Sequence, residues 1–97
     1  MNNRTVKSFN EPGNVAVFTT RYVIRQGHPI LNIFHHEDDG AWVFVGDDVC
    51  HDDSDYLLLA LEEIIEHDPS VLDVADLPLG WCAIRDKPGR PWLIQKM

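Results

Sequence analysis

Five short runs of apolar and β-branched residues, separated by turn residues, predict the strands of a sheet. The first run is Val15–Thr20 (VAVFTT), and the others are Ile30–His36, Ala41–Val45, Trp81–Arg85 and Pro91–Gln95. Runs of this composition that are bounded by Gly, Pro or Asp are typical of strands. Arg21–Gln26 either continues the first strand or forms a short turn before the second.

Two turn sequences predict that neighbouring strands form hairpins. Glu37–Gly40 (EDDG) joins the second and third runs, and Asp-Gly between two β-rich segments is a strong hairpin signal. Asp86–Arg90 (DKPGR) joins the last two runs and contains a Pro-Gly turn. Hairpins between successive strands favour an antiparallel sheet.

The hydrophobic period changes between Tyr56 and His67, which predicts the main helix. Leu57, Leu61 and the pair at 64–65 fall on one apolar stripe at helical spacing. Pro69 ends this helix, and residues 69–76 fit one further helical turn. The predicted fold is therefore α+β, in the order βββ-α-ββ, with a mostly antiparallel sheet of about five strands and the helix on one face. We predict a loose N-terminal arm over residues 1–14 and a single domain over residues 15–97.

The charge of the chain narrows the classes of partner. Sixteen acids and eight bases give a net charge of −8, and no Lys or Arg lies between Arg25 and Arg85. This distribution disfavours nucleic acid and an anionic membrane surface as partners, because both require a basic stripe of residues. It favours a cationic protein as partner, although acids also serve to keep a domain soluble. No apolar run is long enough to span a membrane and the first residues do not resemble a signal peptide, so we expect a cytoplasmic protein.

The chain from Gly40 onward resembles a known bacterial family. Ala41–Asp47 (AWVFVGD) is similar to a G-W-x-F-x-x-G-D/E signature, Asp68-Pro69 follows an apolar segment, and Leu77–Arg85 (LPLGWCAIR) is similar to an L-x-x-P-x-G-x-x-F-x-R ending. Together they resemble a domain-of-unknown-function family that includes predicted immunity proteins of polymorphic toxin systems. The resemblance covers residues 17–92. It implies a cytoplasmic protein that neutralises a toxin by direct binding, and the family offers no catalytic residues to transfer.

Carboxylates and imidazoles cluster at residues 35–39, 47–48 and 51–53 and are potential metal ligands, but their spacing does not fit a known metal site. An EF-hand loop that begins at Asp47 would have Asp52 where glycine is required and Leu58 where the final glutamate is required. His35 and His36 are neighbours on a strand and therefore point to opposite faces. We expect no metal and no cofactor.

Cysteine chemistry is equally unsupported by the sequence. Cys50 and Cys82 are too few for a disulfide framework, and we expect both to be reduced and structural. Cys50 precedes His51, but the surrounding acids disfavour a thiolate. We expect no catalytic residue and no enzymatic activity; a small metal-dependent enzyme ranks third among the function classes.

The predicted partner-binding surface combines acidic residues with one tryptophan. Trp42 and Phe44 alternate on a strand and are predicted to lie in the core. Trp81 and Trp92 lie on the predicted terminal hairpin, where each either packs in the core or stays half exposed. Trp81 replaces a small residue of the family pattern, and it is the candidate for a half-exposed binding anchor, because tryptophan is enriched among binding hot spots. The acids lie in the loops and on the outer face of the helix, at Asp38, Asp39, Asp47, Asp48, Asp52, Asp53, Glu62, Glu63 and Glu66. The leading hypothesis is an immunity-type binding protein, and the alternative is a non-enzymatic regulatory or adaptor domain.

Overall fold

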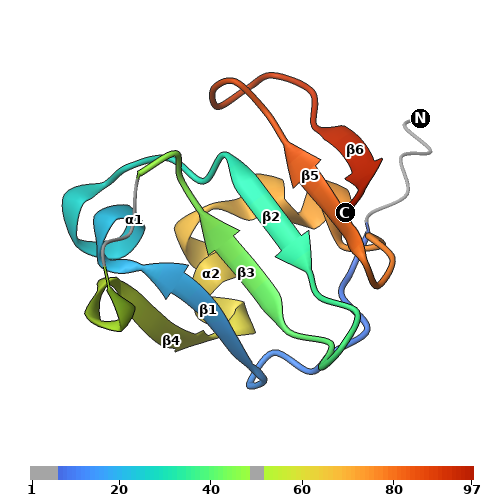
Figure 1. Ribbon diagram of the computed structural model, residues 1–97, viewed down its shortest axis with the longest axis horizontal. Helices are drawn as coiled ribbons and strands as arrows, with labels where there is room; N and C mark the ends of the chain where they lie inside the picture. Colours follow the sequence, from blue (N-terminus) through green and yellow to red (C-terminus); the bar gives the residue numbers. More distant parts are fainter. Residues whose placement is uncertain (1–6, 49–51) are drawn as a thin grey trace, which may run out of the picture.

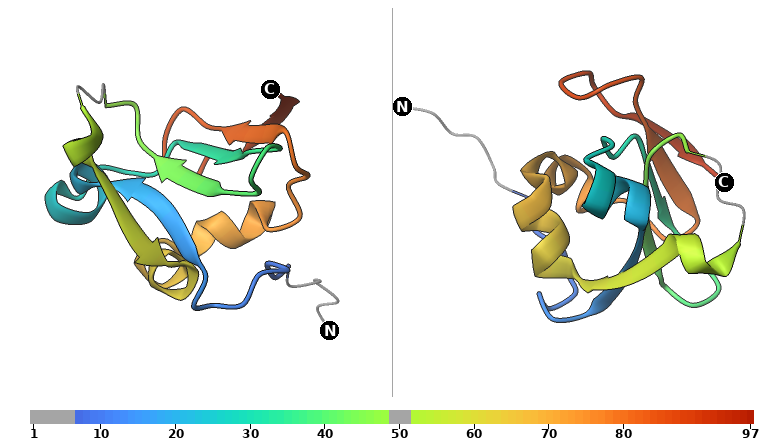
Figure 2. Two further views of the ribbon diagram at one scale, coloured as in Figure 1. Left: turned by 60° about the horizontal axis from the view of Figure 1, so that its bottom comes forward. Right: turned by 90° about the vertical axis from the view of Figure 1, so that its left-hand side faces the viewer.

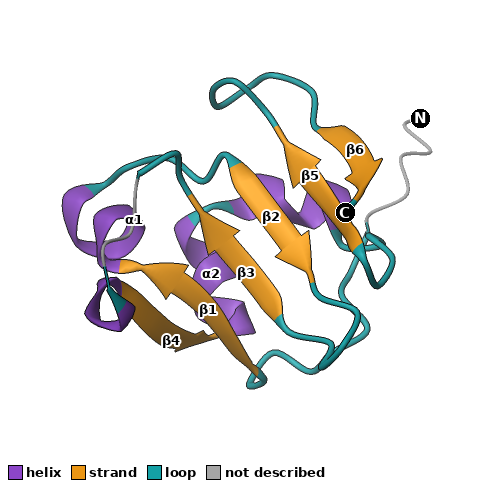
Figure 3. Cartoon of the chain, viewed as in Figure 1, coloured by secondary structure: helices purple, strands orange, loops and turns teal. Residues whose placement is uncertain are grey.

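Six strands form one sheet, in the order β4-β1-β3-β2-β5-β6 (Figure 1). The structure is a computed structural model that describes residues 7–48 and 52–97. The strands are β1 (Ala16–Thr20), β2 (Asn32–His35), β3 (Trp42–Val45), β4 (Tyr56–Ala60), β5 (Trp81–Ile84) and β6 (Leu93–Lys96). The helices are α1 (Arg21–Gln26) and α2 (Leu61–His67), with two 3₁₀-helices, η1 (Asp53–Asp55) and η2 (Pro69–Val74). Figure 3 distinguishes the helices from the strands by colour.

The α+β class and the mostly antiparallel sheet agree with the prediction. Both predicted hairpins are present, since β2 pairs antiparallel with β3 and β5 pairs antiparallel with β6. Gly40 closes the first hairpin in the left-handed region, at φ 74°, where a side chain would be strained. The pairing of β1 with β3 is parallel, and β4 adds to the other side of β1 in the antiparallel sense.

The prediction of one helix from Tyr56 to His67 is wrong for its first half. Tyr56–Ala60 is strand β4, which pairs along its whole length with β1, and the helix begins only at Leu61. The run YLLLA is apolar at every position, so it fits a buried helix face and a strand equally well. Tertiary pairing with β1 decides between them. The observed sheet consequently has six strands.

Residues 21–26 form a helix, which neither of the two alternatives for this segment had predicted. The Thr20 hydroxyl accepts a hydrogen bond from the backbone N–H of Val23 at 3.3 Å and caps the first turn. Gly27 ends the helix in the left-handed conformation, at φ 71°. Both capping signals are present in the sequence, but six residues are too few to show a helical period.

One face of the sheet carries the core. Figure 2 shows α2 and η2 stacked on one side of the strands, and Figure 1 looks onto the opposite side. Trp42 and Phe44 point from β3 toward the helices and are buried, as predicted. Leu61 and Ile64 meet them from α2, and both are also buried.

Residues 7–14 of the expected loose arm are attached to the helix side of the sheet. The ring of Phe9 meets that of Trp42 edge to face, with centroids 5.0 Å apart. The Trp42 indole N–H donates to Glu11 Oε2 at 2.8 Å, and Lys7 forms an ion pair with Asp76 at 3.2 Å. Residues 1–6 lie outside the described part of the chain.

Arg85 joins three segments at the end of β5. Its Nε and Nη2 atoms donate to the carbonyl oxygen of Ile30 at 3.1 and 2.9 Å. Nη2 also donates to Asp68 Oδ2 at 3.1 Å, and the guanidinium lies 4.1 Å above the ring of Trp92. Arg85 is only 6% exposed, so this cation is held in the interior by its partners.

Leu61→Ala is expected to lower the free energy of unfolding by about 2–5 kcal/mol, because the side chain is fully buried and its removal leaves a cavity. Glu66→Ala, on the exposed side of the same helix, is the matched control and should change stability by less than about 0.5 kcal/mol. Urea denaturation of both variants measures the difference. Equal losses would show that the helix does not pack through Leu61.

Candidate protein-binding surface

The face of the sheet opposite the helices carries an uninterrupted row of side chains that crosses all six strands. The pairing registers place one residue of each strand in line. The row runs through Leu58, Phe18, Val43, Phe34, Cys82 and Gln95. Five of these six side chains are apolar, and no helix of the described part lies over this side in Figure 1. We call this side of the sheet the open face.

The open face is exposed where it approaches β4 and is hollowed in the middle. Phe18 is 38% exposed, Tyr56 42% and Leu58 61%. A hollow of about 860 Å³ lies over the strands, and Phe34 and Val43 line it together with these three residues. The rings of Phe34 and His36 stack in it with centroids 6.1 Å apart. Most of the residues that line this hollow are apolar.

Two of the predicted acids, Asp39 and Asp53, line the same hollow. Asp39 lies in the β2–β3 turn, where its Oδ1 accepts the N–H of Ala41 at 2.9 Å. Asp38 accepts the N–H of Asp39 at 3.0 Å and stays exposed beside it. Asp53 begins η1 and is exposed. The open face is therefore apolar in the middle and acidic at its edge.

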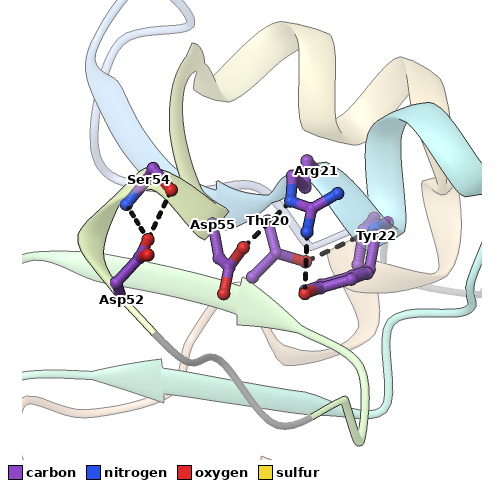
Figure 4. A network of polar contacts seen from close by, with 7 residues as sticks. Thr20, Arg21, Tyr22, Asp52, Ser54 and Asp55 are labelled. Atoms are coloured by element: carbon purple, nitrogen blue, oxygen red, sulfur yellow. Dashed lines mark hydrogen bonds and ion pairs between the residues drawn. The ribbon is translucent and has the colours of Figure 1, made fainter.

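An ion pair between the partly exposed Arg21 and the buried Asp55 positions η1 and with it Asp53. Arg21 Nε donates to Asp55 Oδ1 at 2.9 Å, and its Nη2 donates to the hydroxyl of Tyr22 at 3.1 Å (Figure 4). The hydrogen bond that Arg21 donates to Asp55 raises the pKa of the Arg21 guanidinium above its ordinary value. Asp52 caps η1 by accepting from the N–H of Ser54 at 2.8 Å.

The remaining predicted acids do not gather at the open face. Asp47 is exposed in the loop after β3, whereas Asp48 accepts from His28 Nδ1 at 2.8 Å. The three glutamates lie on α2, which packs against the other face. Among them, Glu63 Oε1 accepts the N–H of Ala60 at 3.0 Å, and the backbone N–H of Glu62 donates to Gly13. Asp48 and Glu63, which were predicted to bind a partner, thus form hydrogen bonds within the protein itself.

Trp81 lies away from the open face. It pairs with His35 across the sheet and is packed against the buried core on the helix side. His35 stacks there on Trp42 at 3.9 Å between centroids, and its Nδ1 lies 2.7 Å from the carbonyl oxygen of Leu77. Trp81 is therefore only partly exposed, on the side opposite the hollow.

Two arrangements among the described residues could serve acid–base chemistry. His28 faces Asp48, and His35 Nε2 lies 3.8 Å from Glu11 Oε2. Among the described residues no Ser, Thr or Cys side chain donates a hydrogen bond to either imidazole, as the nucleophile of a triad would. The described residues contain no group of three or more His, Cys, Asp or Glu side chains arranged to hold a metal. Cys82 is a free, buried thiol, and the Cys50–His51 pair lies outside the described residues.

The part of the chain that the structure describes contains no helix with the length and hydrophobicity of a membrane span. Comparisons with protein-family models, curated proteins and solved structures found no match, so the function of this chain is inferred from its own residues.

Proposed function

We propose that this protein is a binding protein that holds a cationic partner protein against its open face. The observation that carries the proposal is the row across the sheet, which is apolar on five of its six strands, with Phe18 and Leu58 left in solvent. Contiguous exposed apolar surface of this kind marks interaction sites on soluble proteins. An aromatic side chain in the middle of such a surface is the usual form of a hot spot.

The charge around the row supports a cationic partner. Asp39 and Asp53 lie at the hollow, and the stretch between Arg25 and Arg85 contains no Lys or Arg. Acids at the rim of an interface attract a basic surface and orient it during the encounter, while the apolar centre supplies affinity.

A bacterial toxin is the partner that the family resemblance supports. A toxin that acts on nucleic acid must have a basic cleft, and an acidic protein with an apolar centre is suited to occupy it. Binding there would block the substrate directly and would require no catalysis by the immunity protein. The same surface on a regulatory adaptor would bind a cationic protein that is not toxic, so a toxicity assay separates the two functions.

Phe18→Lys tests the proposal, because it places a cation in the middle of the open face. We expect the affinity for the partner to fall about 30-fold or more, which corresponds to the loss of one hot spot. Leu79→Lys is the matched control: Leu79 is also an exposed apolar side chain, 51% exposed, but it lies beside Glu11 and His35 on the other side of the sheet.

The partner is isolated from lysate of the native host with wild-type protein as bait, and the three forms are then compared by titration. Retained binding by Leu79→Lys and loss by Phe18→Lys would support the open face. Equal affinities of the two variants would overturn it. The identified partner is then expressed in bacteria with and without the wild-type protein. An immunity protein must restore the growth that the partner inhibits.

A further inference from the structure

Strand β4 is an unprotected edge of the sheet. It is the outermost strand next to β1, and its sequence, YLLLA, contains no charge and no proline. Edge strands usually carry charges, proline or a bulge, since an open row of N–H and C=O groups invites pairing with another chain. β4 has none of these within its length, and its side chains continue the apolar surface of the open face.

The direction of the backbone groups along β4 follows from one hydrogen bond. The N–H of Leu61 donates to the carbonyl oxygen of Val15 at 2.8 Å. Because hydrogen-bonded pairs alternate in an antiparallel ladder, Leu59 and Leu57 direct their backbone groups toward β1. Leu58 and Ala60 direct theirs to the free edge.

At both ends of this edge the outward backbone N–H is hydrogen-bonded within the protein. The N–H of Tyr56 donates to the carbonyl oxygen of Asp53, and the N–H of Ala60 donates to Glu63 Oε1 at 3.0 Å. No described residue bonds to the outward N–H and C=O of Leu58. The edge therefore offers one complete donor–acceptor pair, at its centre.

The charges at the two ends indicate what can occupy the edge. Asp52 and Asp53 precede β4, and Glu62 and Glu63 follow it. A second copy that paired antiparallel around Leu58 would bring the acidic η1 of one chain toward the acidic first turn of α2 of the other, and like charges brought close together repel. An extended segment with basic residues on both sides of an apolar centre has the complementary pattern.

We propose that the cationic partner adds an extended strand to the free edge of β4, with Leu58 as the central hydrogen-bonded position and with lysine or arginine residues at both ends of the added strand. This inference rests on the proposed function and specifies how the partner is held. Main-chain hydrogen bonds supply affinity in such strand addition, and alternate side chains supply specificity. The side chains on one side of the added strand would extend the row that begins at Leu58.

Leu58→Pro removes the outward N–H without breaking a bond to β1, because proline is tolerated at an edge position whose N–H faces solvent. Leu58→Ala is its control, since it shortens the side chain and keeps the N–H. For the isolated partner, we expect Leu58→Pro to bind about tenfold more weakly than Leu58→Ala, as the loss of a main-chain hydrogen bond predicts. Equal binding by the two variants, together with loss in Phe18→Lys, would overturn strand addition and leave the proposed function intact.

A synthetic peptide on the wild-type protein tests the same point without a variant. The probe alternates valine and threonine over five residues between pairs of lysines, and its control carries an N-methyl group on the central residue. With saturating probe, the amide hydrogen exchange of Leu58, measured by NMR, should slow at least fivefold, and the N-methylated control should leave it unchanged. Shifts confined to Phe18 and Phe34, or protection of Leu58 that rises with protein concentration alone, would overturn the proposal, the latter in favour of a second copy.

Discussion

Replacement of Arg85 by leucine is expected to lower the free energy of unfolding by about 3–5 kcal/mol, the range found when one partner of a buried ion pair is removed. The substitution leaves the carbonyl oxygen of Ile30 without its two donors and leaves Asp68 without its cation. It also removes the contact with the ring of Trp92. For a domain of this size each kcal/mol corresponds to about 4–8 °C, so the melting temperature should fall by more than about 10 °C.

Two companion variants identify the cause. Arg90→Leu removes an exposed cation from the same hairpin and should change stability by less than about 0.5 kcal/mol. Asp68→Asn keeps an oxygen for the cap of η2, where Asp68 accepts from the N–H of Ser70, but removes the charge. If Arg85→Leu and Arg90→Leu unfold at the same temperature by calorimetry, Arg85 does not hold the three segments together.

Removal of the two carboxylates at the hollow should slow association with the partner by about tenfold at low ionic strength. Charge of one sign along a cleft raises association rates by factors of about 10 to 1,000, and Asp39→Asn with Asp53→Asn removes the two acids nearest the apolar row. Both amides retain a side-chain oxygen, so the bond from the N–H of Ala41 can persist. The dissociation rate should change little, since the apolar contacts are preserved.

The control for this experiment removes the same number of negative charges from positions outside the hollow. Asp73→Asn with Asp86→Asn alters two exposed acids remote from the hollow. Stopped-flow association is measured from low salt to about 0.5 M, where the screening length falls well below the ~8–10 Å of ordinary conditions. The wild type and the control should slow with salt, whereas the rim variant should be slow throughout. If all three proteins share one salt dependence, the acids at the hollow do not steer the partner.

Much of the fold could be predicted from local signals. The turn at residues 37–40 and the Pro-Gly turn at residues 86–90 specify hairpins by themselves, and the alternation of Trp42 and Phe44 identifies the inner face of β3. Tyr56–Ala60 could not be assigned in this way, because a run that is apolar throughout contains no period. Its conformation depends on β1, which lies far away in the sequence.

The candidate site was harder to predict, because its acids are close in sequence and separate in structure. Asp48 pairs with His28 and Glu63 caps Ala60, whereas Asp39 and Asp53 converge from two loops on one hollow. The apolar residues at the outward-facing positions of the strands were a sequence signal for the open face. Val43 and Phe18 occupy the alternate positions of runs that would be polar if the second side of the sheet faced only water.

The position of β1 between β4 and β3 also affects the order in which the chain can fold. β1 is synthesised first among the strands, but its neighbours are β3 and β4, so its two ladders close long loops. The β2–β3 hairpin needs only a short loop and can form before them, because loop closure is the main cost of non-local pairing. Val17 and Phe18 consequently remain without their native neighbours until Ala60 has left the ribosome, and this first strand is the segment of the nascent chain that most needs protection from aggregation.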